Sequence, residues 1–170
     1  MPEPDGTSVV EHEVRVEAPP ETVFSYFTDP AKLVSWMGAE ATLDPRAGGI
    51  CRLKMNEVVV MLGEFVEVEP HRRIVFTWGY EQELFSVPPQ STTVEVLFEP
   101  DGEGTWVRLY HRRLPDAPRV TAFHRGGWQH YFGRLAIAAT GADPGPDPVG
   151  TFEAAIRAQR ELERNLGTDR

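Results

Sequence analysis

Two histidines, His12 and His111, have the residue type and the spacing best suited to chemistry inside a fold. His12 alternates in phase with Val10 and Val14, and His111 is in phase with Leu109. Because successive residues of a β-strand point to opposite faces, both imidazoles are predicted to face the interior. Imidazole titrates near neutral pH, so two inward histidines could transfer a proton or orient the polar group of a ligand. The alternative is that each is a core histidine with its own partner, or lies at a strand end.

Tyr131 joins these histidines as a candidate because it lies on the inward face of a predicted long helix, with His124 as a further residue that could point the same way. If the protein is an enzyme, His12, His111 and Tyr131 are the acid and base candidates. No other catalytic residue is identified.

Common catalytic and metal-binding patterns are absent from the sequence. It contains no phosphate-binding glycine loop ending in Lys-Ser/Thr, no Gly-x-Ser-x-Gly and no His-Glu-x-x-His. His124 and His130 are six positions apart on the predicted helix, so they point about 120° from each other and cannot share a metal ion. Cys51, the only cysteine, has no assignable histidine partner and is expected to be an inert thiol. We therefore expect neither a metal nor a cofactor.

Composition limits the class of protein and of partner. The chain has 170 residues, of which 41% are hydrophobic, a size and content typical of one globular domain. Its net charge is −9, from 26 acidic and 17 basic residues, which disfavours binding to nucleic acid. No apolar run reaches eighteen residues, the first residues are acidic and turn-rich, and a single cysteine cannot form an internal disulfide. We expect a cytoplasmic protein without a membrane partner.

Hydrophobic periodicity predicts a strand, two short helices, a series of strands and a long helix. A half-buried strand covers 9–18, one helix begins at Pro19-Pro20 and ends before Pro30, and a second begins at Ala31 and ends at Gly38. The next strands are predicted at 50–55, 58–68, 74–78, 92–98 and 105–112, and a helix follows from 120 to 138. Consecutive strands joined by such short turns should be antiparallel.

The domain boundaries follow from the same pattern. Residues 1–8 are expected to be a disordered N-terminus, 9–140 one domain, and 141–150, rich in proline and glycine, a linker. An extra amphipathic helix is predicted at 151–166, and its apolar stripe is expected to dock on the sheet or on a second subunit. An unpaired edge strand and this stripe would permit a homodimer without requiring one.

Several segments together resemble one protein family. Residues 17–24 (EAPPETVF), 28–30 (TDP) with Trp36, 63–70 (GEFVEVEP), 73–78 (RIVFTW) and 124–128 (HRGGW) occur in the order found in the heat-shock protein 90 ATPase activator-like branch of the SRPBCC, or START-like, superfamily. The resemblance covers about residues 9–140. It implies an α+β helix-grip fold, in which a curved antiparallel sheet wraps around a long C-terminal helix and two short helices follow the first strand.

A helix lying on a curved sheet leaves space beside the line of contact, so the fold implies an apolar cavity. Gly127 within the long helix fits such a cavity, since a helical glycine costs stability and is usually kept for close packing or access. The predicted ligand-binding residues are His12, Trp36, Met37, Phe76, Trp78, Val94, Val96, Phe98, Leu109, His111, Gly127, Trp128 and Tyr131. The alternative for each apolar residue is that it only fills the core.

Three functions remain open from the sequence. The first is non-catalytic binding of a small hydrophobic or amphipathic molecule in the cavity. The second, from other members of the superfamily, is a cyclase or hydrolase-like enzyme acting on a polyketide or aromatic substrate. The third is a co-chaperone that stimulates the heat-shock protein 90 ATPase, an expectation weakened because no client-binding domain precedes the resemblance.

Overall fold

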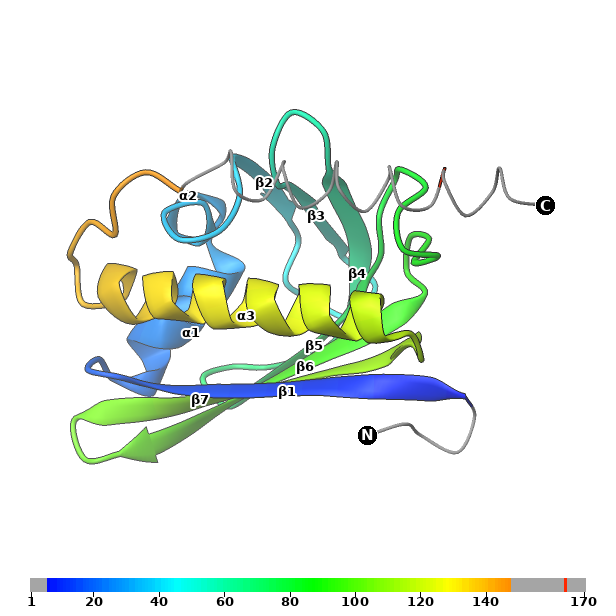
Figure 1. The fold of residues 1–170 in the computed structure, drawn as a ribbon. Coiled ribbons are helices and arrows are strands. Elements are labelled where there is room, and N and C mark those ends of the chain that lie inside the picture. The colour runs from blue at the N-terminus through cyan, green and yellow to red at the C-terminus, as the bar shows by residue number, and fades with distance from the viewer. Residues whose placement is uncertain (1–5, 148–163, 165–170) are drawn as a thin grey trace.

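The structure, a computed structural model, describes residues 6–147 and residue 164, and forms one antiparallel sheet with three helices (Figure 1). The strands are β1 (Thr7–Val16), β2 (Glu40–Leu43), β3 (Ile50–Lys54), β4 (Val60–Glu69), β5 (Arg73–Trp78), β6 (Thr92–Asp101) and β7 (Gly104–Pro115), and the helices are α1 (Pro20–Thr28), α2 (Pro30–Leu33) and α3 (Pro118–Ala138). Strand order is β1-β7-β6-β5-β4-β3-β2, and every pairing is antiparallel. The first strand, β1, therefore pairs with the last, β7.

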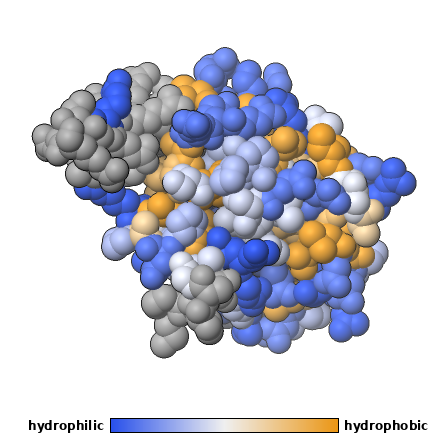
Figure 2. All heavy atoms as spheres, turned by 90° about the vertical axis from the view of Figure 1, so that its right-hand side faces the viewer, coloured by the Kyte–Doolittle hydropathy of each residue, from blue (hydrophilic) through white to orange (hydrophobic). Residues whose placement is uncertain are grey.

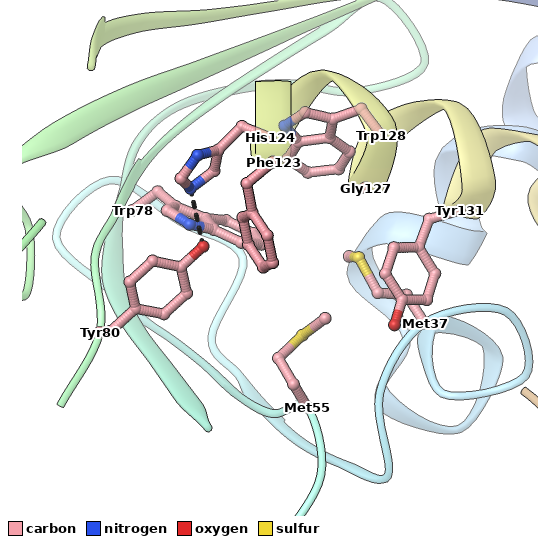
Figure 3. A pocket seen from close by; sticks show the side chains of 9 residues that line it. All are labelled: Met37, Met55, Trp78, Tyr80, Phe123, His124, Gly127, Trp128 and Tyr131. Carbon is pink, nitrogen blue, oxygen red and sulfur yellow. Dashed lines mark hydrogen bonds between the residues drawn. The ribbon is translucent and has the colours of Figure 1, made fainter. Parts of the chain in front are cut away.

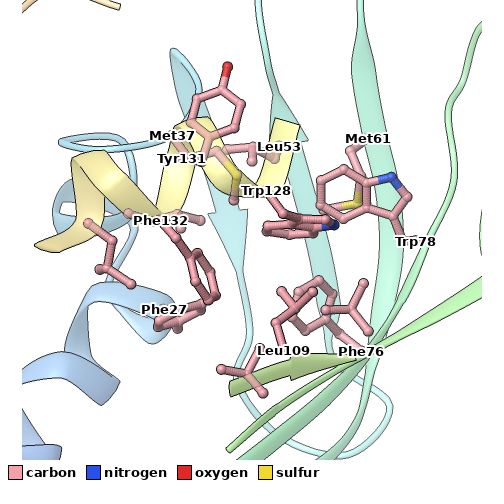
Figure 4. Close-up of a cluster of buried hydrophobic side chains, with 14 of the residues drawn as sticks. Phe27, Met37, Leu53, Met61, Phe76, Trp78, Leu109, Trp128, Tyr131 and Phe132 are labelled. Carbon is pink, nitrogen blue, oxygen red and sulfur yellow. The ribbon is translucent and has the colours of Figure 1, made fainter. Parts of the chain in front are cut away.

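Helix α3 lies across one face of the sheet beside β1, and α1 and α2 lie on the same side (Figure 1). This arrangement confirms the predicted α+β helix-grip fold with two short helices after the first strand. Phe132 of α3 contacts Phe27 of α1 at a ring-centroid distance of 6.4 Å, so the helices share one core. Figure 4 shows side chains of α3, α1 and the strands meeting between the helix and the sheet.

The two short helices begin and end where local chemistry dictates. Proline occupies the first turn of α1, and Asp29 then separates the two helices, its Oδ1 accepting hydrogen bonds from the backbone N–H groups of Ala31 at 2.9 Å and Lys32 at 3.2 Å. The turn after α2 ends at Gly38, whose φ of +83° favours glycine. A side chain there would also come within 2.7 Å of Leu53. This turn brings Met37 beneath α3.

Alternation along the strands gives the sheet an apolar inner face and a charged outer face. On the outer face, Arg73 Nε donates to Glu95 at 2.7 Å, Arg112 Nη1 donates to the same carboxylate at 3.0 Å, and Glu67 pairs with Arg73. Opposite charges on adjacent strands favour one register over its neighbours. Figure 2 shows one side of the molecule, where hydrophobic side chains reach the surface in patches between hydrophilic ones.

Most predicted elements are present within a few residues of their expected ends, but the second helix, expected to reach Gly38, ends at Leu33 and continues as a turn. β1 begins at Thr7, within the segment expected to be disordered, and ends at Val16. The short strand β2 was not predicted, because its four residues Glu-Ala-Thr-Leu carry little apolar content. The predicted helix at 151–166 lies outside the described residues except for Arg164. None of the described helices is long and apolar enough to cross a membrane.

Candidate functional site

The candidate site is a cavity between α3 and the sheet, near the ends of β3 and β5 (Figure 3). The space not filled by atoms is about 330 Å³ when its opening to solvent is included, but the part that the centre of a water-sized molecule can occupy is only about 20 Å³. Its lining residues are Met37, Met55, Trp78, Tyr80, Phe123, His124, Gly127, Trp128 and Tyr131. None of these nine is an aspartate, glutamate, lysine or arginine, so the wall is uncharged and almost entirely apolar.

Five of the predicted ligand-binding residues line this cavity: Met37, Trp78, Gly127, Trp128 and Tyr131. The other eight, which are His12, Trp36, Phe76, Val94, Val96, Phe98, Leu109 and His111, lie in the core around it or along the sheet. Contact between these eight and a ligand stays a prediction.

Four lining residues were not among the predicted ligand-binding residues. Tyr80 follows Trp78 at a spacing of two, so continuing the strand alternation past Gly79 would have identified it. Phe123 lies four residues before Gly127, so helical periodicity already placed the two residues on the same face of the helix. Met55 directly follows β3 and continues the alternation of the buried residues Cys51 and Leu53, so the strand pattern carried information here too. His124 was named only as a further residue that could point inward.

His124 and Tyr80 form a buried hydrogen-bonded pair at one end of the cavity. His124 Nδ1 lies 2.7 Å from the carbonyl oxygen of Val120, which can only accept, so Nδ1 carries the proton of the neutral ring. Nε2 is then the acceptor, and the Tyr80 hydroxyl, 2.8 Å away, donates to it. Both nitrogens of this imidazole are therefore occupied by protein groups.

His111 has a second buried set of partners. Trp128 Nε1 donates to His111 Nδ1 at 3.1 Å, so Nε2 carries the proton and donates to Thr92 Oγ1 at 2.8 Å. Thr92 in turn donates to the carbonyl oxygen of Trp78 at 2.7 Å. This imidazole is a satisfied core residue that fixes the orientation of the Trp128 ring in the cavity wall.

Burial keeps both of these histidines neutral. Desolvation lowers the pKa of His124 to about 4. The pKa of His111 also falls well below its ordinary value, first through desolvation and then through His124, whose ring centroid is 5.3 Å away. Desolvation also raises the pKa of the Tyr80 hydroxyl. Proton transfer to a ligand would require one of these hydrogen bonds to break.

His12 faces the helix, as predicted, but occupies a different environment from His111. It lies on the edge strand β1, is half-buried, and packs its ring against Phe132 at 5.5 Å. Its Cα pairs with Leu109, whereas His111 pairs with Val10. His111 instead contacts the rings of Trp78, His124 and Trp128. The two predicted histidines therefore have different neighbours, and neither is among the residues that line the cavity.

The segment after α3 folds back and holds part of the cavity wall. The Tyr131 hydroxyl donates to Asp147 at 2.9 Å, and His130 Nε2 lies 2.8 Å from the other oxygen of the same carboxylate. Arg134 donates from Nε to the carbonyl oxygen of Trp36 at 3.0 Å and from Nη2 to that of Gly145 at 3.0 Å. These contacts connect the turn that carries Met37 to α3.

Within the described part of the chain, no three His, Cys, Asp or Glu side chains gather into a group that could hold a metal ion. Cys51 is buried, and desolvation raises the pKa of its thiol to about 12. A thiol that stays protonated is a poor nucleophile and a poor metal ligand. The cavity therefore offers shape, aromatic surface and neutral hydrogen-bonding groups.

The profile of the family described as "Activator of Hsp90 ATPase homolog 1-like protein" matches residues 17–140. The chain belongs to this family. The match confirms the resemblance inferred from the sequence, and it covers every residue that lines the cavity.

Solved structures with the same fold include an AHSA1-like protein from Rhizobium etli, which is 40% identical, has a TM-score of 0.67, and is matched over 84% of this chain and 88% of that one. DynU16, described as a putative protein in the dynemicin biosynthetic locus, is 25% identical with a TM-score of 0.70 over 82% of this chain and 50% of its own. An uncharacterized Schizosaccharomyces pombe protein, C1711.08, is 32% identical over 73 residues, which are 43% of this chain and 21% of that protein. The chain thus spans half of DynU16 and about a fifth of the yeast protein.

Proposed function

We propose that this protein binds a small hydrophobic molecule, without catalysis, in the cavity between α3 and the sheet. The observation that carries the proposal is the uncharged aromatic and methionine wall around a space left open by Gly127. A side chain built at Gly127 would meet nothing within 4 Å. A glycine inside a helix costs about 1 kcal/mol relative to alanine, so its retention beside a cavity favours a role in access.

A ligand of even one ring must enlarge the free space of about 20 Å³. Met37 and Met55 are suited to this, since methionine side chains are unbranched and change rotamer at little cost. Figure 3 shows both side chains on the wall opposite Trp78 and His124. We infer that ligand entry displaces these methionines, while the aromatic wall and its hydrogen-bonded histidines stay in place.

Titration with N-phenyl-1-naphthylamine, a neutral fluorophore that brightens in apolar surroundings, tests this proposal. Binding of one molecule per chain should accompany energy transfer from Trp78 or Trp128, whose rings lie 5.1 Å apart. A probe that binds without involving either tryptophan would place the site elsewhere. Failure to bind this probe or other neutral ring compounds would refute the proposal.

The DynU16 likeness favours a small-molecule context, since that protein is named for a biosynthetic locus. It also keeps the enzymatic alternative open for this chain, with turnover of an aromatic or polyketide-like substrate as its test. The family description keeps the co-chaperone alternative open, which stimulation of a purified Hsp90 ATPase would establish. A homodimer, for which sedimentation is the test, stays a prediction.

A further inference from the structure

We propose that the ligand of this cavity is uncharged and carries an oxygen that accepts a hydrogen bond from the indole N–H of Trp78. This inference rests on the proposed function and narrows the chemical class of the ligand. It predicts that a ketone, ester, phenol or alcohol attached to a ring is preferred over a carboxylate of the same size.

Trp78 supplies the first observation. Its side chain is only 4% exposed, and its Nε1 is a buried nitrogen without a hydrogen-bond partner among the described residues. The other two buried indoles are satisfied: Trp36 Nε1 donates to Tyr26 O at 2.9 Å, and Trp128 Nε1 donates to His111. Buried donors are paired in the great majority of cases, so an unpaired one in a cavity-lining residue is a donor that an acceptor atom of a ligand would satisfy.

Tyr80 supplies the second observation. Figure 3 shows the Trp78 indole nitrogen beside the Tyr80 hydroxyl at one end of the cavity. Burial raises the pKa of the Tyr80 hydroxyl, and the nearby Trp78 N–H has a smaller, opposite effect. The Trp78 N–H nevertheless makes no well-formed hydrogen bond with the Tyr80 oxygen. Because Tyr80 donates its proton to His124, its oxygen retains lone pairs. A ligand oxygen reaching this end could accept from Trp78, and a ligand hydroxyl could also donate to Tyr80.

The electrostatics of the wall supply the third observation. No charged side chain lines the cavity, and both neighbouring histidines, His111 and His124, are held neutral by burial. A ligand carboxylate would lose its hydration without gaining a cationic partner, which is strongly unfavourable. A neutral carbonyl or hydroxyl oxygen needs only one donor, and Trp78 offers one.

Three probes of matched shape test the inference: acetophenone, α-methylstyrene and benzoate. The first two differ only in a C=O against a C=CH₂ group, and benzoate replaces the methyl with a charged oxygen. Without a donor, acetophenone should bind about tenfold more weakly than α-methylstyrene, because its carbonyl is desolvated without compensation. If the Trp78 N–H donates to the carbonyl oxygen, acetophenone should bind at least as tightly as α-methylstyrene. Benzoate should bind far more weakly than either neutral compound.

The indole N–H signals in ¹H–¹⁵N NMR spectra provide a second readout on the unmodified protein. Acetophenone should move one indole proton downfield, as a new hydrogen bond does, whereas α-methylstyrene should not produce this shift. The signal should be the one missing from Trp78→Phe. That variant should also return acetophenone to about tenfold weaker binding than α-methylstyrene, while Trp106→Phe, on the outer face of β7, should behave as the wild type.

The outcomes separate the two proposals. If both neutral probes bind, but acetophenone binds tenfold more weakly and no indole signal shifts, the proposed role of Trp78 is refuted. The proposal that the apolar cavity binds a ligand would then be retained. Benzoate binding as tightly as acetophenone would refute the exclusion of charge. No saturable binding of any probe would refute the proposed function and this inference with it. If Trp78→Phe fails to fold, the probe ratio and the indole shift of the wild type still decide.

Discussion

Replacing Gly127 by leucine should close the cavity while leaving the fold intact. A Cβ built at Gly127 meets no atom within 4 Å, so the new side chain has room to enter. The space open to a water-sized molecule is only about 20 Å³, and a leucine side chain would occupy it. We expect binding of N-phenyl-1-naphthylamine to weaken at least tenfold.

Gly126 is the matched control for this substitution. It is the preceding residue of α3, it is exposed, and its Cβ would likewise meet nothing within 4 Å. Replacing either glycine by leucine should stabilise the helix by roughly 0.5–1 kcal/mol, which corresponds to a rise of about 1–4 °C in melting temperature for a domain of this size. Gly126→Leu should therefore be more stable than the wild type and bind the probe with unchanged affinity.

Fluorescence titration and thermal unfolding of both variants measure these effects. Affinity and stability should change independently: Gly127→Leu should fold and lose binding of the probe, while Gly126→Leu should fold and retain it. Equal affinities in the two variants would show that the probe does not occupy the cavity beneath Gly127. A large loss of stability in Gly127→Leu would mean that the space is too tight for the side chain.

Three further predictions follow from buried groups and from the segment after α3. The free energy of unfolding should decrease as the pH drops from about 6.5 to 4, because in this range His124 becomes protonated in the unfolded chain but not in the folded chain. The steepest decrease is about 1.4 kcal/mol per pH unit for each such histidine. His111 acts in the same direction, so urea unfolding that is independent of pH between 7 and 4.5 would contradict the neutral assignment. Cys51 should react with a disulfide reagent only at the rate of unfolding, and rapid labelling at pH 8 would overturn its burial. Asp147→Ala removes the acceptor of the Tyr131 hydroxyl, so proteolysis within 140–147 should accelerate; an unchanged cleavage rate would show that this carboxylate does not hold the segment.

The sequence by itself determined the order of elements and the face on which most side chains lie. Alternation at a spacing of two placed His111 on the inner face of β7, and helical spacing placed Trp128 and Tyr131 on the inner side of α3. Proline positions located the first short helix and the start of the second, whereas α2 ends at Leu33 and a turn, not a helix, leads to Gly38. These are local properties, because the direction of a side chain depends on the backbone geometry of its own few neighbours.

Only the tertiary structure decided which of these inward side chains meet one another. His12 and His111 share a face of the sheet. His12, on the edge strand β1, contacts Phe132 of α3, whereas His111 is enclosed by Trp78, His124 and Trp128. The register of the two strands, in which Val10 pairs with His111 and His12 pairs with Leu109, is likewise not indicated by any local pattern.

The cavity wall was likewise decided by segments far apart in the chain. The curvature of the sheet and the position of the helix bring together Met55, which follows β3, Tyr80, which follows β5, and His124 of α3. The Tyr80–His124 hydrogen bond spans 44 residues, and neither residue has a local feature that specifies the other. A periodic pattern encodes direction relative to the backbone, whereas distance between segments depends on how all their side chains pack at once.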